Sequence, residues 1–147
     1  MLRMFNSRTA TGVCALCVAG VLFFLFSGCG KSVKKEGRDN NSLEKIVLEY
    51  WNNRLVSRNY QASYAREMDK DSVPYETYED LVSRNERFQF SDVKADIEKI
   101  EAQKASVLVS VKAIIPALRV PLDRTFKDQW IYSDSGLWQH RFSKSQP

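Results

Sequence analysis

The spacing of apolar residues changes near Phe88, and this change constrains the fold more than any other feature of the sequence. Before it, apolar residues recur every three or four positions, which is typical of helices with one buried face. After it, apolar and polar residues alternate, which is typical of strands that pack one face on a core. Helices followed by a run of strands predict an α+β domain, with N-terminal helices packed on one face of a bent antiparallel sheet.

Three helices are expected before Phe88. Asn41 and Ser42 can cap the first one, which is predicted to end near Arg58 and Asn59 because asparagine tolerates the left-handed conformation. Its apolar stripe consists of Leu43, Ile46, Val47, Tyr50, Trp51 and Leu55.

The second and third helices are shorter. Tyr60, Tyr64 and Met68 lie four residues apart and predict one side of the second helix. Pro74 suits the first turn of the third helix, with Ser72 as its cap. The apolar stripe of the third helix consists of Tyr75, Tyr78, Leu81 and Val82.

The second half of the chain predicts a meander of strands. The apolar parity switches near Ser91 and near Glu98, which indicates two β-bulges. A stretch rich in β-branched residues from Ala105 to Ile115 predicts a strand. Pro116 and Pro121 bracket a segment that we expect at a sheet edge or between strands. The last alternating positions are Phe126, Trp130 and Tyr132 before a turn at 133–136, and Trp138, His140 and Phe142 after it.

Two basic residues near the N-terminus, Arg3 and Arg8, precede an apolar run of 16 residues from Gly12 to Ser27. A helix that spans a bilayer needs about 20 apolar residues. The run therefore has the length of the apolar part of a secretion signal. An uncleaved membrane anchor and simple secretion are the alternatives to the interpretation that follows.

The end of this run, Leu25-Phe26-Ser27-Gly28-Cys29, resembles the lipobox of bacterial lipoproteins. The resemblance implies a cleaved signal peptide over residues 1–28, cleavage between Gly28 and Cys29, and a lipid on the thiol of Cys29. The protein is then expected in the bacterial cell envelope, anchored to a membrane by that lipid. Gly30 after the cysteine favours the outer membrane where there are two.

Composition excludes several kinds of site. The three cysteines, Cys14, Cys17 and Cys29, all lie in the signal or at the lipid site, so no disulfide framework, cysteine nucleophile or thiolate metal site is expected after processing. His140 is the single histidine, which argues against a histidine-rich metal site. No metal or other cofactor is expected.

The net charge of +4 is concentrated at the N-terminus. The signal carries two of these charges, and residues 29–42 carry the other two as a net excess. The predicted domain, residues 43–147, is neutral, so the chain lacks the basic surface that nucleic-acid binding requires. Residues 29–42 are polar and are predicted to form a flexible, basic tether beside the bilayer.

The order of elements resembles the nuclear-transport-factor-two-like fold, which ketosteroid isomerases and polyketide cyclases share. The resemblance covers about residues 43–143 and rests on Tyr50-Trp51, on Asn59 to Tyr64 and on the hairpin from Asp128 to Trp138. A cystatin-like domain is the nearest alternative, and the number of helices, two against one, separates the two folds. The family's cone-shaped fold implies a pocket between the first helix and the sheet, and the candidates to line it are Tyr50, Trp51, Tyr64, Tyr78, Phe126 and Trp130. The alternative is that these aromatic residues only fill the core.

Enzymes of this superfamily place an acid, a tyrosine or a histidine in the pocket as a proton shuttle. Asp128 and His140 occupy even positions of two strands that a turn joins, so they can be near neighbours. No nucleophile elbow, phosphate-binding glycine loop or metal-spaced carboxylate set is present. We therefore expect an envelope lipoprotein whose domain binds a small apolar ligand or a protein partner. The alternatives are an isomerase or dehydratase that uses His140 and Asp128, and an accessory subunit of a membrane complex.

Overall fold

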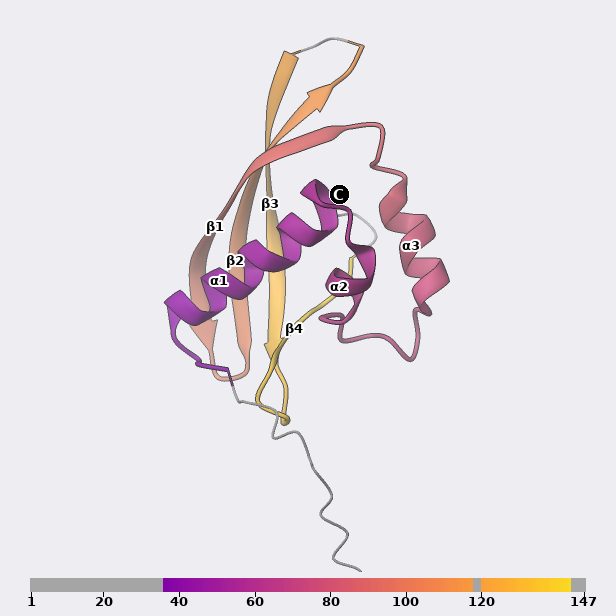
Figure 1. Cartoon of the computed structure of the whole chain (residues 1–147). Helices are drawn as coiled ribbons and strands as arrows, with labels where there is room; N and C mark the ends of the chain where they lie inside the picture. The colour runs from indigo at the N-terminus through magenta and orange to yellow at the C-terminus, as the bar shows by residue number, and fades with distance from the viewer. Residues whose placement is uncertain (1–35, 118–119, 144–147) are drawn as a thin grey trace, which may run out of the picture. The chain divides into compact units, whose positions relative to one another are not determined.

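The structure is a computed structural model that describes residues 36–117 and 120–143. In Figure 1, helices lie on one face of a four-stranded antiparallel sheet whose strands follow one another in chain order. This is the α+β class that the apolar spacing predicts. The elements are α1 (Asn40–Trp51), a π-helical segment (Asn52–Val56), α2 (Tyr60–Tyr64), α3 (Tyr75–Ser83), β1 (Gln89–Glu101), β2 (Lys104–Ile115), β3 (Val120–Tyr132) and β4 (Trp138–His140).

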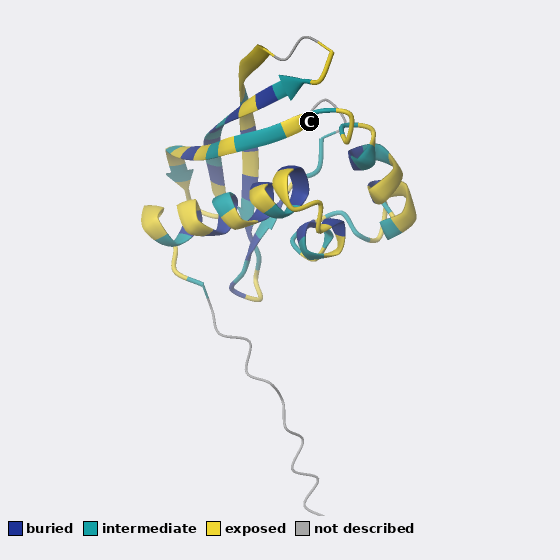
Figure 2. Cartoon of the chain, turned by 45° about the horizontal axis from the view of Figure 1, so that its top comes forward, coloured by how far each residue is buried: buried dark blue, intermediate teal, exposed yellow. Residues whose placement is uncertain are grey.

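The apolar stripe of the first helix is buried as predicted. Figure 2 shows the buried residues of α1 turned towards the strands and its exposed residues turned away. The buried residues of α1 pack against the inner face of β2, where Val107, Val109 and Val111 are buried. The helix begins slightly earlier than predicted, because the side chain of Asp39 accepts a hydrogen bond from the backbone N–H of Ser42 at 2.9 Å.

The first helix ends in a π-helical turn that the sequence does not predict. This wider turn holds one more residue than an α-helical turn, and both Arg54 and Leu55 are buried in it. The chain then reverses at Arg58, which has a positive φ of 56°. The predicted stop is therefore confirmed, but Arg58 adopts the left-handed conformation, and Asn59 caps α2 instead.

The second helix is shorter than predicted. It ends at Tyr64, and Met68, which was expected on its apolar side, is 40 % exposed. Residues 66–68 run beside β4: the N–H of Met68 donates to the carbonyl of His140 at 2.9 Å, and the N–H of His140 donates to the carbonyl of Arg66 at 2.8 Å. These backbone groups find partners in a distant strand, so the helix does not continue.

In the third helix, Tyr78 and Val82 are buried as expected, while Tyr75 is only partly buried. Pro74 occupies the cap position that was assigned to Ser72. The hydroxyl of Ser72 donates instead to the carbonyl of Asp69 at 3.0 Å.

Both predicted bulges are present in β1. The register against β2 shifts between Ser91 and Lys94 and again between Ile97 and Lys99. Figure 1 shows that the first part of β1 curves away over the helices. The segment around Pro121 belongs to β3, which pairs with β2 along its whole length but with β4 only over Trp130–Tyr132. Pro121 therefore lies in a part of β3 that β4 does not cover, which agrees with the expected edge position.

The folded unit begins before the predicted boundary at residue 43. The N–H of Glu36 donates to the carbonyl of Gly136 at 2.8 Å, and the hydroxyl of Tyr132 donates to the carbonyl of Glu36 at 2.7 Å. The guanidinium of Arg38 lies 4.2 Å from the centre of the Tyr132 ring. Residues 36–42 are thus part of the domain rather than of a flexible tether, whereas residues 1–35 lie outside the described residues.

Candidate functional site

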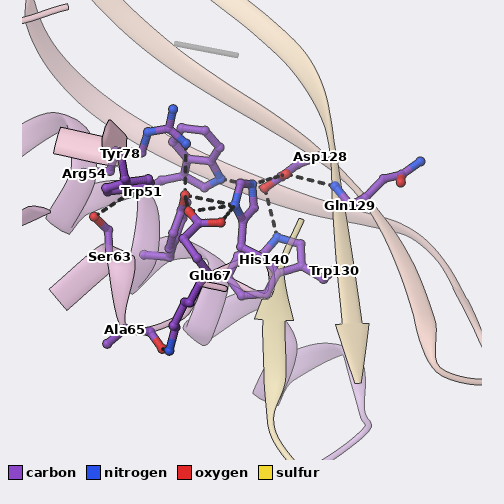
Figure 3. Close-up of polar contacts among 12 residues, drawn as sticks. Trp51, Arg54, Ser63, Ala65, Glu67, Tyr78, Asp128, Gln129, Trp130 and His140 are labelled. Carbon is purple, nitrogen blue, oxygen red and sulfur yellow. Dashed lines mark hydrogen bonds and ion pairs between the residues drawn. The ribbon is translucent and has the colours of Figure 1, made fainter. Parts of the chain in front are cut away.

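His140 lies at the centre of a buried polar cluster (Figure 3). Its Nε2 is 2.8 Å from Oδ1 of Asp128, and its Nδ1 is 2.9 Å from Oε2 of Glu67. Asp128 is on β3, two residues before the position that pairs with His140, and Glu67 is in the segment beside β4. The structure thus brings together Asp128 and His140, the two residues that their strand positions suggested as neighbours, and adds a second carboxylate.

Three further N–H groups bind the carboxylate of Asp128. Its Oδ2 accepts hydrogen bonds from Nε1 of Trp51 at 2.8 Å and from Nε1 of Trp130 at 2.9 Å. Its Oδ1 accepts a bond from the backbone N–H of Gln129 at 2.9 Å. A carboxylate with this many donors is stabilised in its ionised form even where water does not reach it.

Tyr50 and Arg54 extend the cluster from the side of α1. The hydroxyl of Tyr50 donates to Oε1 of Glu67 at 2.5 Å and lies 3.0 Å from Nδ1 of His140. Nη1 of Arg54 donates to the same hydroxyl at 2.9 Å. The guanidinium also lies 4.9 Å from the ring centre of Trp51, while its Nε has no partner within the described ranges. A chain of hydrogen bonds therefore connects Arg54, Tyr50, Glu67, His140 and Asp128.

The four charge-bearing side chains of this cluster are almost fully enclosed. The exposed fractions are 0 % for Asp128 and His140, 2 % for Glu67 and 3 % for Arg54. With His140 protonated, two cations face two anions and the cluster is neutral. Charge balance of this kind is what makes buried ionised groups tolerable.

The surroundings shift the proton affinities of the cluster. Burial disfavours the imidazolium form of His140, but the carboxylates of Asp128 and Glu67 outweigh burial and raise its pKa to about 9. Burial opposes ionisation of Asp128, but His140 and the indole donors outweigh it and lower the pKa of that carboxyl. Burial, together with neighbouring Glu67, raises the pKa of Tyr50 well above its usual value. Asp128 and His140 are thus a charged pair at neutral pH, and Tyr50 is a neutral donor.

The donor arrangement does not suit a metal ion. Glu67 and Asp128 contact opposite nitrogens of the His140 ring, so their oxygens do not converge on one point. Across residues 36–117 and 120–143, no group of three or more histidine, cysteine, aspartate and glutamate side chains is placed to hold a metal ion.

The six aromatic residues suggested for a pocket lie in two clusters. Tyr50, Trp51 and Trp130 are buried in the main core with their rings edge to face, and Phe126 packs against Trp51 at 4.8 Å between ring centres. Tyr64 and Tyr78 belong to a smaller cluster around α2 and α3.

A hollow of about 340 Å³ opens elsewhere, and Trp130 is the one residue of those six among its lining. Apart from Trp130 and Ala105, which belong to the core, the lining residues alternate with the core residues of their strands, so their side chains point to the face of the sheet away from α1. The complete lining is Lys99, Glu101, Lys104, Ala105, Ser106, Gln129, Trp130, Ile131 and Arg141.

Comparison with models of known protein families finds no match to this chain, and comparison with curated protein sequences finds none either. In the part of the chain that the structure describes, no helix has the length and apolar character needed to cross a bilayer. Gly28 and Cys29, the predicted cleavage and lipidation site, lie outside the described residues.

Sequence reasoning did not find Arg54 and Glu67. Arg54 had a detectable signal, since it lies four residues after Tyr50 and interrupts the apolar stripe of the first helix. Glu67 had none, because its role depends on residues 66–68 leaving the helix and pairing with a strand more than 70 positions later in the chain.

Proposed function

We propose that this chain is a lipid-anchored protein of the bacterial envelope whose domain binds a partner and does not catalyse a reaction. The observation that carries this proposal is the enclosure of His140. It is fully buried, and both of its ring nitrogens are already occupied by carboxylates. A general acid or base must come within hydrogen-bond distance of a substrate proton, and this imidazole has no free nitrogen to offer.

The packing of the aromatic residues favours a partner at the surface over a small apolar ligand inside. In the main core, the ring of Tyr50 contacts both Trp51 and Trp130 edge to face. These rings are part of the packed core. The hollow lies on the other face of the sheet and has charged and polar side chains. Surface recognition is therefore the activity that this arrangement supports.

We also propose that the domain has a nuclear-transport-factor-two-like architecture. Three α-helices precede the sheet, whereas a cystatin-like domain would have one. The long first helix packs on the inner face of strands that bulge in two places, and bulges bend and twist a strand. Both features support the cone-shaped arrangement.

Enclosure of the cluster can be tested with diethyl pyrocarbonate, which modifies accessible imidazoles. His140 is the only histidine in the chain, so the modification reports on one site. We expect no modification of the native protein and rapid modification in urea. Modification of the native protein at the rate of a free imidazole would favour the alternative, an isomerase or dehydratase in which the hydrogen-bonded chain from Tyr50 to Asp128 moves protons.

The lipid anchor can be tested by feeding cells a labelled fatty acid. We expect label in the parent protein and none in Cys29→Ala, with Cys14→Ala as the matched control that keeps its label. Chemical crosslinking in whole cells then tests the partner, and a domain that is never crosslinked would contradict surface recognition.

A further inference from the structure

One end of the sheet gathers three parts of the chain that lie far apart in sequence. Nε2 of Gln103, in the turn between β1 and β2, donates to Oδ1 of Asp134, in the turn between β3 and β4, at 3.4 Å. Glu36, the first described residue, is bonded to Gly136 in that second turn. Figure 1 shows both turns and the chain leading into α1 at the lower end of the sheet, opposite the turn between β2 and β3. The segment that carries the predicted lipid therefore enters the domain at this end.

The hollow on the outer face of the sheet lies at the same end. Its lining includes residues directly before and after the β1–β2 turn, Glu101 and Lys104, and Arg141 directly after β4. Lys99 forms an ion pair with Glu101. The side chains of Lys104 and Arg141 are exposed and have no ion-pair partner among residues 36–117 and 120–143. The hollow thus presents two cations whose charge is not neutralised locally.

Polar and apolar groups surround these two cations. Ser106 and Gln129 provide hydrogen-bonding side chains, and Ile131 provides apolar surface. Cations beside hydroxyl and amide groups are suited to a phosphate that carries a polar substituent. Two acidic residues lie at this end: Glu101, which lines the hollow and pairs with Lys99, and Asp134 in the turn between β3 and β4.

The length of chain before the domain limits how far this end can lie from a lipid on Cys29. Seven residue steps separate Cys29 from Glu36, which span at most about 25 Å when fully extended. The sequence of this stretch includes three lysines, Lys31, Lys34 and Lys35. The opposite end of the sheet is farther away by the length of β2, roughly 35 Å for 12 residues.

We propose that the hollow around Lys104 and Arg141 is a docking site for the anionic phosphate headgroups of the bilayer in which the protein is anchored. The domain then stands with the β1–β2 and β3–β4 turns towards the membrane and with the β2–β3 turn away from it. This inference rests on the proposed lipid anchor at Cys29. It adds a fixed orientation, set by charge, to an attachment that the lipid alone would leave free to rotate.

The test uses the lipidated protein, reconstituted by its own anchor into vesicles of phosphatidylcholine alone or of phosphatidylcholine and phosphatidylglycerol in equal parts. A fluorophore is attached at Ser135→Cys, in the membrane-facing turn, or at Ala117→Cys, in the turn at the other end. Both positions are exposed. Quenching by a headgroup-labelled lipid then reports the proximity of each end to the bilayer.

We expect strong quenching at position 135 only in vesicles with phosphatidylglycerol, and little quenching at position 117 in either. The double charge reversal Lys104→Glu and Arg141→Glu should lower the quenching to the level seen with phosphatidylcholine alone. Lys45→Glu and Lys94→Glu, a matched pair of exposed lysines elsewhere, should leave it unchanged. Asp134→Asn should increase it, because the opposing charge is removed.

Three results would overturn the inference. Equal quenching at position 135 in both kinds of vesicle, equal quenching at both ends, or no effect of the double reversal would each show that the hollow does not dock on the anionic surface while the anchor still holds. Failure of the protein to float with vesicles of either kind would instead overturn the proposed lipid anchor, and this inference with it. Flotation is therefore measured first in every sample.

Discussion

Opposite charges meet in two very different regions of this domain. Around His140, two carboxylates, an imidazolium and a guanidinium are enclosed by tryptophan and tyrosine rings. On the surface, pairs such as Asp80 with Arg84 keep about two thirds of each side chain exposed. Water screens the exposed pairs, so each contributes little to stability. In the cluster no water compensates for a lost partner, so the removal of one group leaves the others as uncompensated buried charges.

The buried region also joins more of the fold than the exposed pairs do. Asp80 and Arg84 lie one helical turn apart within the same helical stretch. The cluster connects α1 through Tyr50, the segment beside β4 through Glu67, β3 through Asp128 and β4 through His140. We infer that its main contribution is to select one arrangement of these four segments, since every wrong arrangement would bury an unpaired charge.

The largest effect is expected from Asp128→Ala. The substitution leaves the imidazolium of His140 and the indole N–H groups of Trp51 and Trp130 without their acceptor. The free energy of unfolding should fall by about 3–5 kcal/mol, a large part of the stability of a small domain. Urea denaturation measures it. Asp123→Ala, an exposed aspartate of the same strand, is the control and should change stability by less than about 0.5 kcal/mol.

Raising the pH should remove nearly as much stability as that substitution. The pKa of His140 is raised to about 9 in the folded protein, whereas an unfolded histidine titrates near 6.5. Between these values the folded state binds the extra proton, so its stability is complete below about pH 6.5 and falls as the pH rises through 9, by about 3 kcal/mol. Urea unfolding at a series of pH values measures this slope. In His140→Gln the slope should disappear, and a slope that persisted there would assign it to another group.

Tyr50→Phe should have a smaller effect, because it removes a hydroxyl and no charge. The hydroxyl bridges Arg54 and Glu67 and contacts His140. A loss of about 2 kcal/mol is expected, as for hydrogen bonds to charged groups. Tyr75→Phe is the matched control, because its hydroxyl bonds to Glu79 at an exposed position. Equal losses in both variants would contradict the contrast between buried and exposed regions.

The smallest effect is expected from Arg84→Ala, which breaks the exposed pair with Asp80. The free energy of unfolding should change by about 0.3–0.5 kcal/mol at low ionic strength. This change should shrink further in concentrated salt, where exposed charges are screened. Thermal unfolding at two salt concentrations tests it, and a loss of more than 1 kcal/mol would show that exposed pairs in this protein are not weak.

The fold was predictable to the extent that local spacing governs it. The apolar stripe of α1, the start of the strands near Phe88 and both bulges of β1 follow from period and parity alone. The end of α2 did not follow, because Met68 continues a helical spacing that the backbone abandons. There the hydrogen bonds offered by β4 outweigh a weak local preference for helix.

The candidate site was predictable only in part. Asp128 and His140 lie on strands joined by a short turn, so their parity places them together. Arg54 lies four residues after Tyr50 and so continues the buried stripe of the helix. Glu67 was not predictable, because no local rule places its segment beside β4.

The sequence by itself determined which segments form helices and strands, since apolar periodicity acts over a few residues at a time and each element must bury one face. The sequence also showed that the net positive charge lies near the N-terminus and that the chain has a single histidine. Only the tertiary structure decided that Glu67 would meet His140, 73 positions later. A buried charge takes its partner from whichever segment packs against it, and that neighbour is chosen by the fold as a whole.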